Sequence, residues 1–167
     1  VARDKEKAIH YFTLAANQNL PHAQFQLGLI YSINEYVACD KEKSIHYFTL
    51  AADQNFALAQ YCLGLIYLNG NLQSIDVRKG IYYLTCAANQ NYVEAQYCLG
   101  TLYFHGELTS RDINKAIHFL TLAANQNNIQ AQVNLGVLYS EIEYNNLDIN
   151  KAIHYLTLAA NQNHEVA

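Results

Sequence analysis

Apolar and polar residues follow two helical patterns that alternate along the chain and recur together every 36 residues. In the first pattern, residues 40–55, an Asp precedes apolar or small residues at helical spacing and an Ala-Ala pair. In the second, residues 57–69, one stripe at i, i+4 and i+8 is formed by Ala59, Leu63 and Tyr67. A fixed period of about 20 to 50 residues is typical of stacked supersecondary units. The sequence therefore predicts an all-α fold, an α-solenoid of helix-turn-helix repeats.

The same residue types begin and end the helices of the first pattern. An N-cap Asp accepts a hydrogen bond from an otherwise unpaired backbone N–H, so each helix is predicted to start after one. Asn is the non-glycine residue that best adopts the left-handed conformation ending a helix, so each is predicted to stop at an Asn. The positions concerned are Asp4, Asp40, Asp76, Asp112 and Asp148, and Asn19, Asn55, Asn91, Asn127 and Asn163.

Glycine marks the helices of the second pattern. A mid-helix Gly costs about 1 kcal/mol relative to Ala, so its recurrence predicts close contact with a neighbouring helix. Gly70 and Gly106 are predicted to end two of these helices, and Asn34 a third. Ile142 stands in the same column of the last unit and carries no stop signal. The mid-helix glycines are Gly28, Gly64, Gly100 and Gly136.

The residues of one unit resemble a known repeat. Ala59 to Tyr67 read A-Q-x-x-L-G-x-x-Y, and a D-x-x-K-A-x-x-Y-x-x-x-A-A pattern follows. This resembles the Sel-one-like repeat (SLR) family, a branch of the tetratricopeptide-like α-solenoids, over nearly the whole chain. Two departures are a helix-ending Asn in place of the family's usual Gly and a short connecting loop. The resemblance implies a right-handed superhelix, with the A-Q-x-x-L-G helix on the concave side and the D-x-x-K-A helix outside.

The period also predicts the organisation of the chain. Residues 1–19 are expected to form a half repeat, the second helix of a preceding unit. Four complete repeats occupy residues 20–163, and residues 164–167 begin a further, truncated repeat. The chain contains no Met and opens directly on a repeat, which indicates a piece of a longer protein.

The units differ mainly on the helix that the resemblance places on the concave side, whereas the outer helix repeats almost verbatim. Distinct side chains on a rigid concave wall suit recognition of one extended segment. The alternative is packing drift in columns that tolerate change. The column near the helix end reads Ser32, Leu68, Phe104 and Ser140. The candidate partner-binding residues are His22, Phe25, Leu29, Leu58, Tyr61, Leu65, Leu68, Glu94, Tyr97, Thr101, Phe104, Gln130, Val133 and Val137.

Charge narrows the class of partner. All ten Lys and Arg fall on the outer helix or the turn before it, and the net charge is -4. Some tetratricopeptide grooves bind a C-terminal carboxylate with paired basic residues and an Asn. Gln26 and Asn134 occupy the column of that Asn. The groove expected here has no basic residues, so it is not expected to bind a carboxylate in this way. RNA or DNA is not expected either, because phosphate contacts require a basic surface. The sequence therefore predicts an adaptor or scaffold for a protein partner, with an apolar or mixed peptide or a partner helix as its ligand.

No catalytic, metal or cofactor site is predicted. One outer-helix column holds His10, His46, His118 and His154. Helices pack about 8–10 Å apart, whereas a zinc ligand lies at about 2 Å, so these residues cannot share one ion. The chain has no His-x-x-x-His pair, phosphate-binding loop or nucleophile elbow. Alternatives to the adaptor are an architectural spacer between flanking domains and a hydrolase-like ligand binder, although the Cys-rich relatives described in that way carry paired Cys that this chain lacks.

The four cysteines do not form a disulfide framework, although spacing leaves a bridge between Cys86 and Cys98 open. Isolated buried thiols behave as small hydrophobes, and their use favours a reducing, cytoplasmic compartment. No apolar run approaches the roughly 20 residues that a membrane-spanning helix needs, so no membrane contact is expected in this sequence.

Overall fold

Helices make up most of the structure, a computed structural model that describes residues 2–32, 40–70, 74–141 and 148–165. No strand occurs in these ranges, and the prediction of an all-α repeat fold is confirmed. Helices of the first sequence pattern are called B helices here, and those of the second are called A helices. The B helices are α1 (Ala2–Asn17), α3 (Lys41–Asp53), α5 (Val77–Asn89), α7 (Ile113–Ala124) and α9 (Asp148–Glu165). The A helices are α2 (Pro21–Ser32), α4 (Ala57–Asn69), α6 (Val93–His105) and α8 (Ile129–Glu141).

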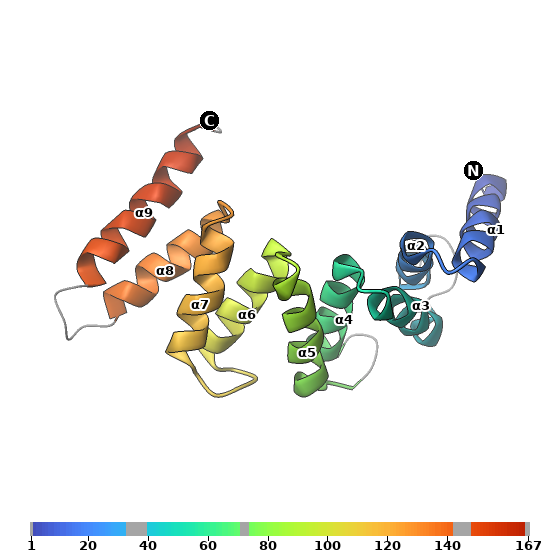
Figure 1. Ribbon diagram of the computed structural model, residues 1–167, viewed down its shortest axis with the longest axis horizontal. Coiled ribbons are helices and arrows are strands. Elements are labelled where there is room, and N and C mark those ends of the chain that lie inside the picture. Colours follow the sequence, from blue (N-terminus) through green and yellow to red (C-terminus); the bar gives the residue numbers. More distant parts are fainter. Residues whose placement is uncertain (1, 33–39, 71–73, 142–147, 166–167) are drawn as a thin grey trace. The chain divides into compact units, whose positions relative to one another are not determined.

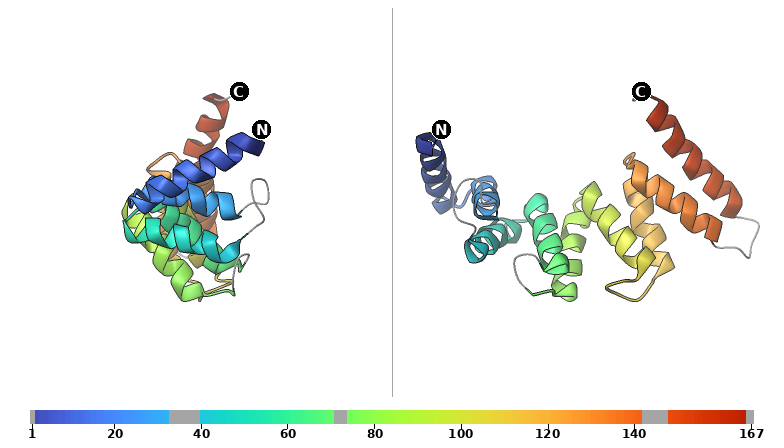
Figure 2. Two further views of the ribbon diagram at one scale, coloured as in Figure 1. Left: turned by 90° about the vertical axis from the view of Figure 1, so that its right-hand side faces the viewer. Right: turned by 180° about the vertical axis from the view of Figure 1, so that it is seen from behind.

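The chain divides into two compact units, Val1–Gln90 (unit 1) and Asn91–Ala167 (unit 2). In unit 1, α2 packs against α3 and α4 packs against α5; in unit 2, α6 packs against α7 and α8 against α9. Figures 1 and 2 show the members of these pairs side by side. Each A helix thus forms a hairpin with the B helix that follows it.

Local capping defines most helix ends as the sequence predicts, but α1 begins at Ala2, before Asp4, and α9 begins at Asp148 itself. The Asp40 carboxylate accepts a hydrogen bond from the backbone N–H of Lys43 at 2.9 Å, and equivalent caps start α5 and α7. Asn19, Asn55, Asn91 and Asn127 all have φ of 61–63°, the left-handed conformation. Gly70 and Gly106 have φ of 65° and 72° at the ends of α4 and α6. Asn34 and Ile142 lie outside the described residues.

The prediction that the last B helix stops at Asn163 is wrong, because α9 continues to Glu165. At two other turns, an amide from the next A helix holds the Asn side chain. Gln24 Nε2 donates to Asn19 Oδ1 at 3.1 Å, and Gln60 Nε2 donates to Asn55 Oδ1 at 3.2 Å. Asn163 has no following A helix among the residues that the structure describes, and helical hydrogen bonding runs on through it.

The mid-helix glycines permit the close A–B contact that their recurrence predicts. A Cβ atom at Gly64 would lie 2.6 Å from Leu84 Cγ, and one at Gly28 would lie 2.6 Å from Phe48 Cδ1. Gly100 and Gly136 meet Leu120 and Leu156 in the same way. Real Cβ atoms do not approach other carbons this closely, so Gly lets the large B-helix side chain pack directly onto the A-helix backbone.

Candidate functional site

The predicted partner-binding residues all lie on A helices, but their exposure separates them into three sets. Residues with an open surface are His22, Glu94, Gln130, Val133 and Val137. Half-buried residues are Leu29, Leu58, Tyr61, Leu65, Tyr97 and Thr101. Buried residues are Phe25, Leu68 and Phe104. The first two sets present side-chain surface that a partner can contact.

The buried set has visible packing partners. The Phe25 ring lies 5.6 Å from that of Phe48, between centroids. Leu68 packs over Gly80, where an added Cβ would lie 2.6 Å from Leu68 Cγ. The Phe104 ring lies 5.4 Å beneath the guanidinium of Arg111. These contacts fit the alternative of packing variation at these three positions, of which Leu68 and Phe104 share one column.

A pocket of about 340 Å³ opens in unit 1, between α2 and α4. Two of its lining residues, Leu29 and Leu65, are predicted site residues on these two helices. The buried Phe48 of α3 also lines the pocket. The remaining lining residues are Ser32 of α2 and Cys62, Ile66 and Asn69 of α4. Both principal helices of the pocket are thus A helices, the helices that carry the predicted partner-binding residues.

The electrostatics of this pocket are those of an uncharged site. Neither α2 nor α4 contains an Asp, Glu, Lys or Arg. Burial raises the pKa of the Cys62 thiol from an ordinary 9.0 to about 11, so the thiol stays protonated near neutral pH. A protonated thiol is a poor nucleophile and a poor metal ligand. The pocket is suited to binding apolar groups.

Unit 2 carries different residues at the corresponding positions. The column of Leu29 and Leu65 holds Thr101 and Val137, and the column of Ser32 and Leu68 holds Phe104 and Ser140. The Arg111 guanidinium over Phe104 also donates to the Glu141 carboxylate at 2.7 Å. Both ions are exposed, so this pair contributes little stability by itself.

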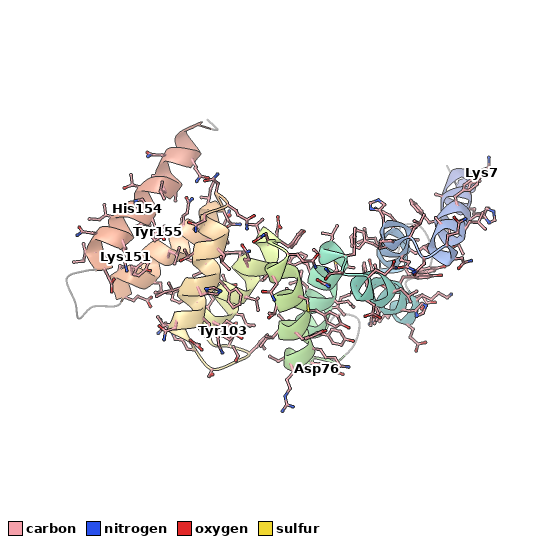
Figure 3. All side chains as sticks on the ribbon, in the orientation of Figure 1. Lys7, Asp76, Tyr103, Lys151, His154 and Tyr155 are labelled. Carbon is pink, nitrogen blue, oxygen red and sulfur yellow. The ribbon has the colours of Figure 1, made fainter. Side chains whose placement is uncertain are left out.

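The distribution of basic residues matches the prediction, because α2, α4, α6 and α8 contain no Lys or Arg. Lys7 and Lys151 extend from the B helices α1 and α9 (Figure 3). The four column histidines, on the B helices α1, α3, α7 and α9, are exposed. Among the described residues, no group of His, Cys, Asp and Glu is placed to hold a metal ion.

The cysteines form no disulfide in the part of the chain that the structure describes. Cys62, Cys86 and Cys98 are all outside any disulfide, so the bridge left open between Cys86 and Cys98 does not form, and Cys39 lies outside the described ranges. A separate result concerns membranes: none of the described helices is long and apolar enough to cross one.

Two features of the site were not predicted from the sequence. The first is the set of pocket residues Phe48, Cys62, Ile66 and Asn69. The second is a repeated amide contact, in which Gln54 Nε2 donates to Gln24 Oε1 at 2.6 Å. Gln recurs at the position of Gln24 and at the position of Gln54 in every complete repeat. This recurrence was the available signal, because a surface amide has no physical reason to recur.

Comparison with known proteins identifies the repeat. The Sel1 repeat profile matches residues 1–20, 21–56, 57–92, 93–128 and 129–164. A Sel1 repeat protein from Oxalobacter formigenes is similar at 33% identity and a TM-score of 0.80, over 95% of this chain and 46% of that one. A protective antigen of uropathogenic Escherichia coli strains, which displays an SLR fold, is similar at 27% identity and a TM-score of 0.85. That match covers 92% of this chain and 33% of the antigen.

A third structure, cysteine-rich protein B of Helicobacter pylori, shares the fold at 24% identity and a TM-score of 0.61. This match covers 78% of the present chain and 94% of that protein. The present chain spans less than half of the Escherichia coli and Oxalobacter formigenes proteins. Among curated proteins, no sequence match reaches significance. The family profile accounts for almost every residue, and the chain belongs to the Sel1 repeat family.

Proposed function

We propose that this chain is a non-catalytic adaptor or scaffold whose A helices bind an apolar or mixed peptide, or a helix, of a protein partner. One observation carries the proposal: the side chains that differ between repeats lie on the A helices, and many of them reach the surface. Variation at exposed positions of a fixed scaffold is how repeat proteins acquire a specific binding surface.

Family membership supports the class of partner. Sel1 repeat proteins are generally protein-interaction modules and are generally non-catalytic. The absence of Lys and Arg from all four A helices argues against an acidic ligand or a nucleic acid on these helices. A partner contact through these helices therefore depends on apolar burial and neutral hydrogen bonds.

Each unit offers suitable contact residues. In unit 1, Tyr61 stands on α4, the helix that also carries Leu58 and Leu65. In unit 2, Tyr97 on α6 and the exposed Val133 on α8 offer the same combination of aromatic and aliphatic surface. Tyr is enriched at protein interfaces because its ring buries a large apolar area while its hydroxyl hydrogen-bonds.

Substitutions on the two kinds of helix test the proposal. Wild-type chain, the double variant Tyr61→Ala/Tyr97→Ala, and the control Tyr82→Ala are immobilised, and captured proteins are quantified by mass spectrometry. Tyr82 lies on the B helix α5 and is 62% exposed, so its truncation removes a similar ring from a B helix and leaves the A helices intact. We expect specific partners to be lost from the double variant and kept by Tyr82→Ala.

Other outcomes favour another function. If all three proteins capture the same partners in the same amounts, the A-helix surface is not the binding site. A chain that captures no specific partner in any form fits an architectural spacer. Thermal unfolding of each variant is measured alongside, because a loss of fold would also remove partners.

A further inference from the structure

We infer that the pocket between α2 and α4 is an anchor site for one bulky, uncharged apolar side chain of the protein partner. The inference rests on the proposed interaction function and specifies which residues receive the ligand. Three features of the molecule support it: the size and lining of the pocket, its lack of charge, and the residue that unit 2 carries in the same column.

The pocket is bounded by well-fixed apolar side chains. Phe48 is only 2% exposed, and its ring is held under Gly28 and against Phe25. Leu29 and Leu65, half-buried, come from α2 and α4. The volume of about 340 Å³ is at the small end of the range of about 300–1,000 Å³ found for ligand sites. A pre-formed site of this size suits a single large side chain, because little ordering entropy is lost on binding.

Residue 32 distinguishes this pocket from the equivalent place in unit 2. Ser32 Oγ donates to Leu29 O at 2.8 Å, which turns its polar group back onto its own helix. In unit 2 the same column holds Phe104, 8% exposed under the Arg111 guanidinium. Unit 2 therefore places a bulky aromatic ring of its own at a position where unit 1 has a small residue beside an open pocket. The chain's own Phe104 indicates the size and chemistry of a ligand side chain.

Charge excludes acidic and basic anchors. A carboxylate or ammonium group entering the pocket would lose hydration and would find no opposite charge on α2 or α4. A Phe or Leu side chain loses no hydration of that kind and gains apolar burial against Leu29, Leu65 and Phe48. Asn69, at the end of α4, offers an exposed amide to the backbone of the same partner segment.

Binding of short peptides tests the anchor site. The probes are end-blocked pentapeptides Gly-Ser-X-Ser-Gly with Phe, Leu, Glu or Lys at X, titrated into methyl-labelled protein and followed by NMR. We expect saturable shifts of the Leu29, Leu65 and Ile66 methyl signals with the Phe and Leu peptides, and none with the charged peptides. Ser32→Phe and the smaller Ser32→Leu should each weaken binding by about tenfold or more, because the burial of one apolar side chain changes the affinity by about this factor.

The chain provides a matched control for these variants. Ser140 stands in the same column of unit 2 and makes the same local bond, its Oγ donating to Val137 O at 2.6 Å. Ser140→Phe should leave binding of the Phe peptide unchanged. If Ser32→Phe does not fold, Ser32→Leu still tests the inference, because Leu68 already occupies this column in α4.

Three results would overturn the inference: no methyl shifts with the Phe or Leu peptide, equal binding of the charged peptides, or undiminished binding by a folded Ser32→Leu variant. Failure here is separate from failure of the proposed function. If the Tyr61→Ala/Tyr97→Ala variant loses its partners while no peptide enters the pocket, the A-helix interface stands without this anchor.

Discussion

The side-chain amide of Gln54 donates to Oε1 of Gln24 at 2.6 Å, joining residues 30 positions apart in the chain. Gln24 is 2% exposed, and its own amide donates to Asn19 Oδ1 in the preceding turn. A buried amide on an A helix thus links the turn before that helix to the end of the B helix that follows it. The same bond recurs in the pairs Gln90–Gln60, Gln126–Gln96 and Gln162–Gln132, at 2.7, 2.8 and 3.1 Å.

The first prediction concerns this amide contact. Gln60→Leu should lower the free energy of unfolding by about 1–3 kcal/mol, because its backbone and side-chain partners lose a buried hydrogen-bonding group. Gln90→Leu should cost less, since Gln90 is exposed and water can replace its contact. Urea unfolding of both single variants and the double variant measures the coupling. Exposed Gln130 serves as the control, and a cost for Gln60→Leu no larger than for Gln130→Leu contradicts the role.

A second prediction concerns the close contact at Gly64. Gly64→Ala should lower stability by about 1–3 kcal/mol through overpacking, because the added Cβ meets Leu84 Cγ at 2.6 Å. The cost should shrink in a Leu84→Ala background, where the colliding atoms are absent. Thermal or urea unfolding of this double-mutant cycle is the measurement. Equal costs of Gly64→Ala in both backgrounds would show that another contact is responsible.

A third prediction addresses the turn at Asn55, where φ is 62°. Asn55→Ala should destabilise the fold by about 1–2 kcal/mol, because Cβ-bearing residues other than Asn and Asp rarely tolerate this conformation. Asn55→Gly should cost less, since it gives up only the bond from Gln60. Asn125, with φ of -66°, provides the control: Asn125→Ala requires no left-handed backbone and should be nearly neutral. If Asn55→Gly proves as costly as Asn55→Ala, the hydrogen bond determines the stability of the turn.

The N-cap of α3 should make stability depend on pH. The backbone N–H and the ammonium of Lys43 hold the pKa of Asp40 below its ordinary value of 3.8. A carboxyl group with a depressed folded-state pKa stabilises the fold above the unfolded pKa, and this contribution is lost as the pH falls through the folded value. Asp40→Asn keeps a good capping side chain but cannot titrate.

Measured from neutral to acidic pH, wild-type stability should therefore fall more steeply below pH 3.8 than that of Asp40→Asn. Thermal unfolding in matched buffers makes the comparison. Asp112, whose pKa is lowered mainly by the backbone N–H of Lys115, should give the same result in unit 2. Parallel pH profiles for wild type and variant would show that the carboxylate charge does not contribute.

Much of the fold could be predicted because its signals are local. The cap at Asp40 and the left-handed turn at Asn55 depend on residues within a few positions of each other, so residue type alone indicates them. The site was less predictable. Helical period places Phe25 and Leu29 on one helix, but it does not show that the first is buried and the second lines a pocket.

The sequence by itself determined the repeat, most helix boundaries within it and the absence of basic residues from the A helices, because each depends on residue type and spacing. Only the tertiary structure decided that α9 continues past Asn163, that Gln54 meets Gln24, and that space remains beside Ser32. These outcomes depend on what neighbouring helices fill or leave open. A side chain is buried, paired or free to receive a partner according to volumes and distances that no single helix specifies.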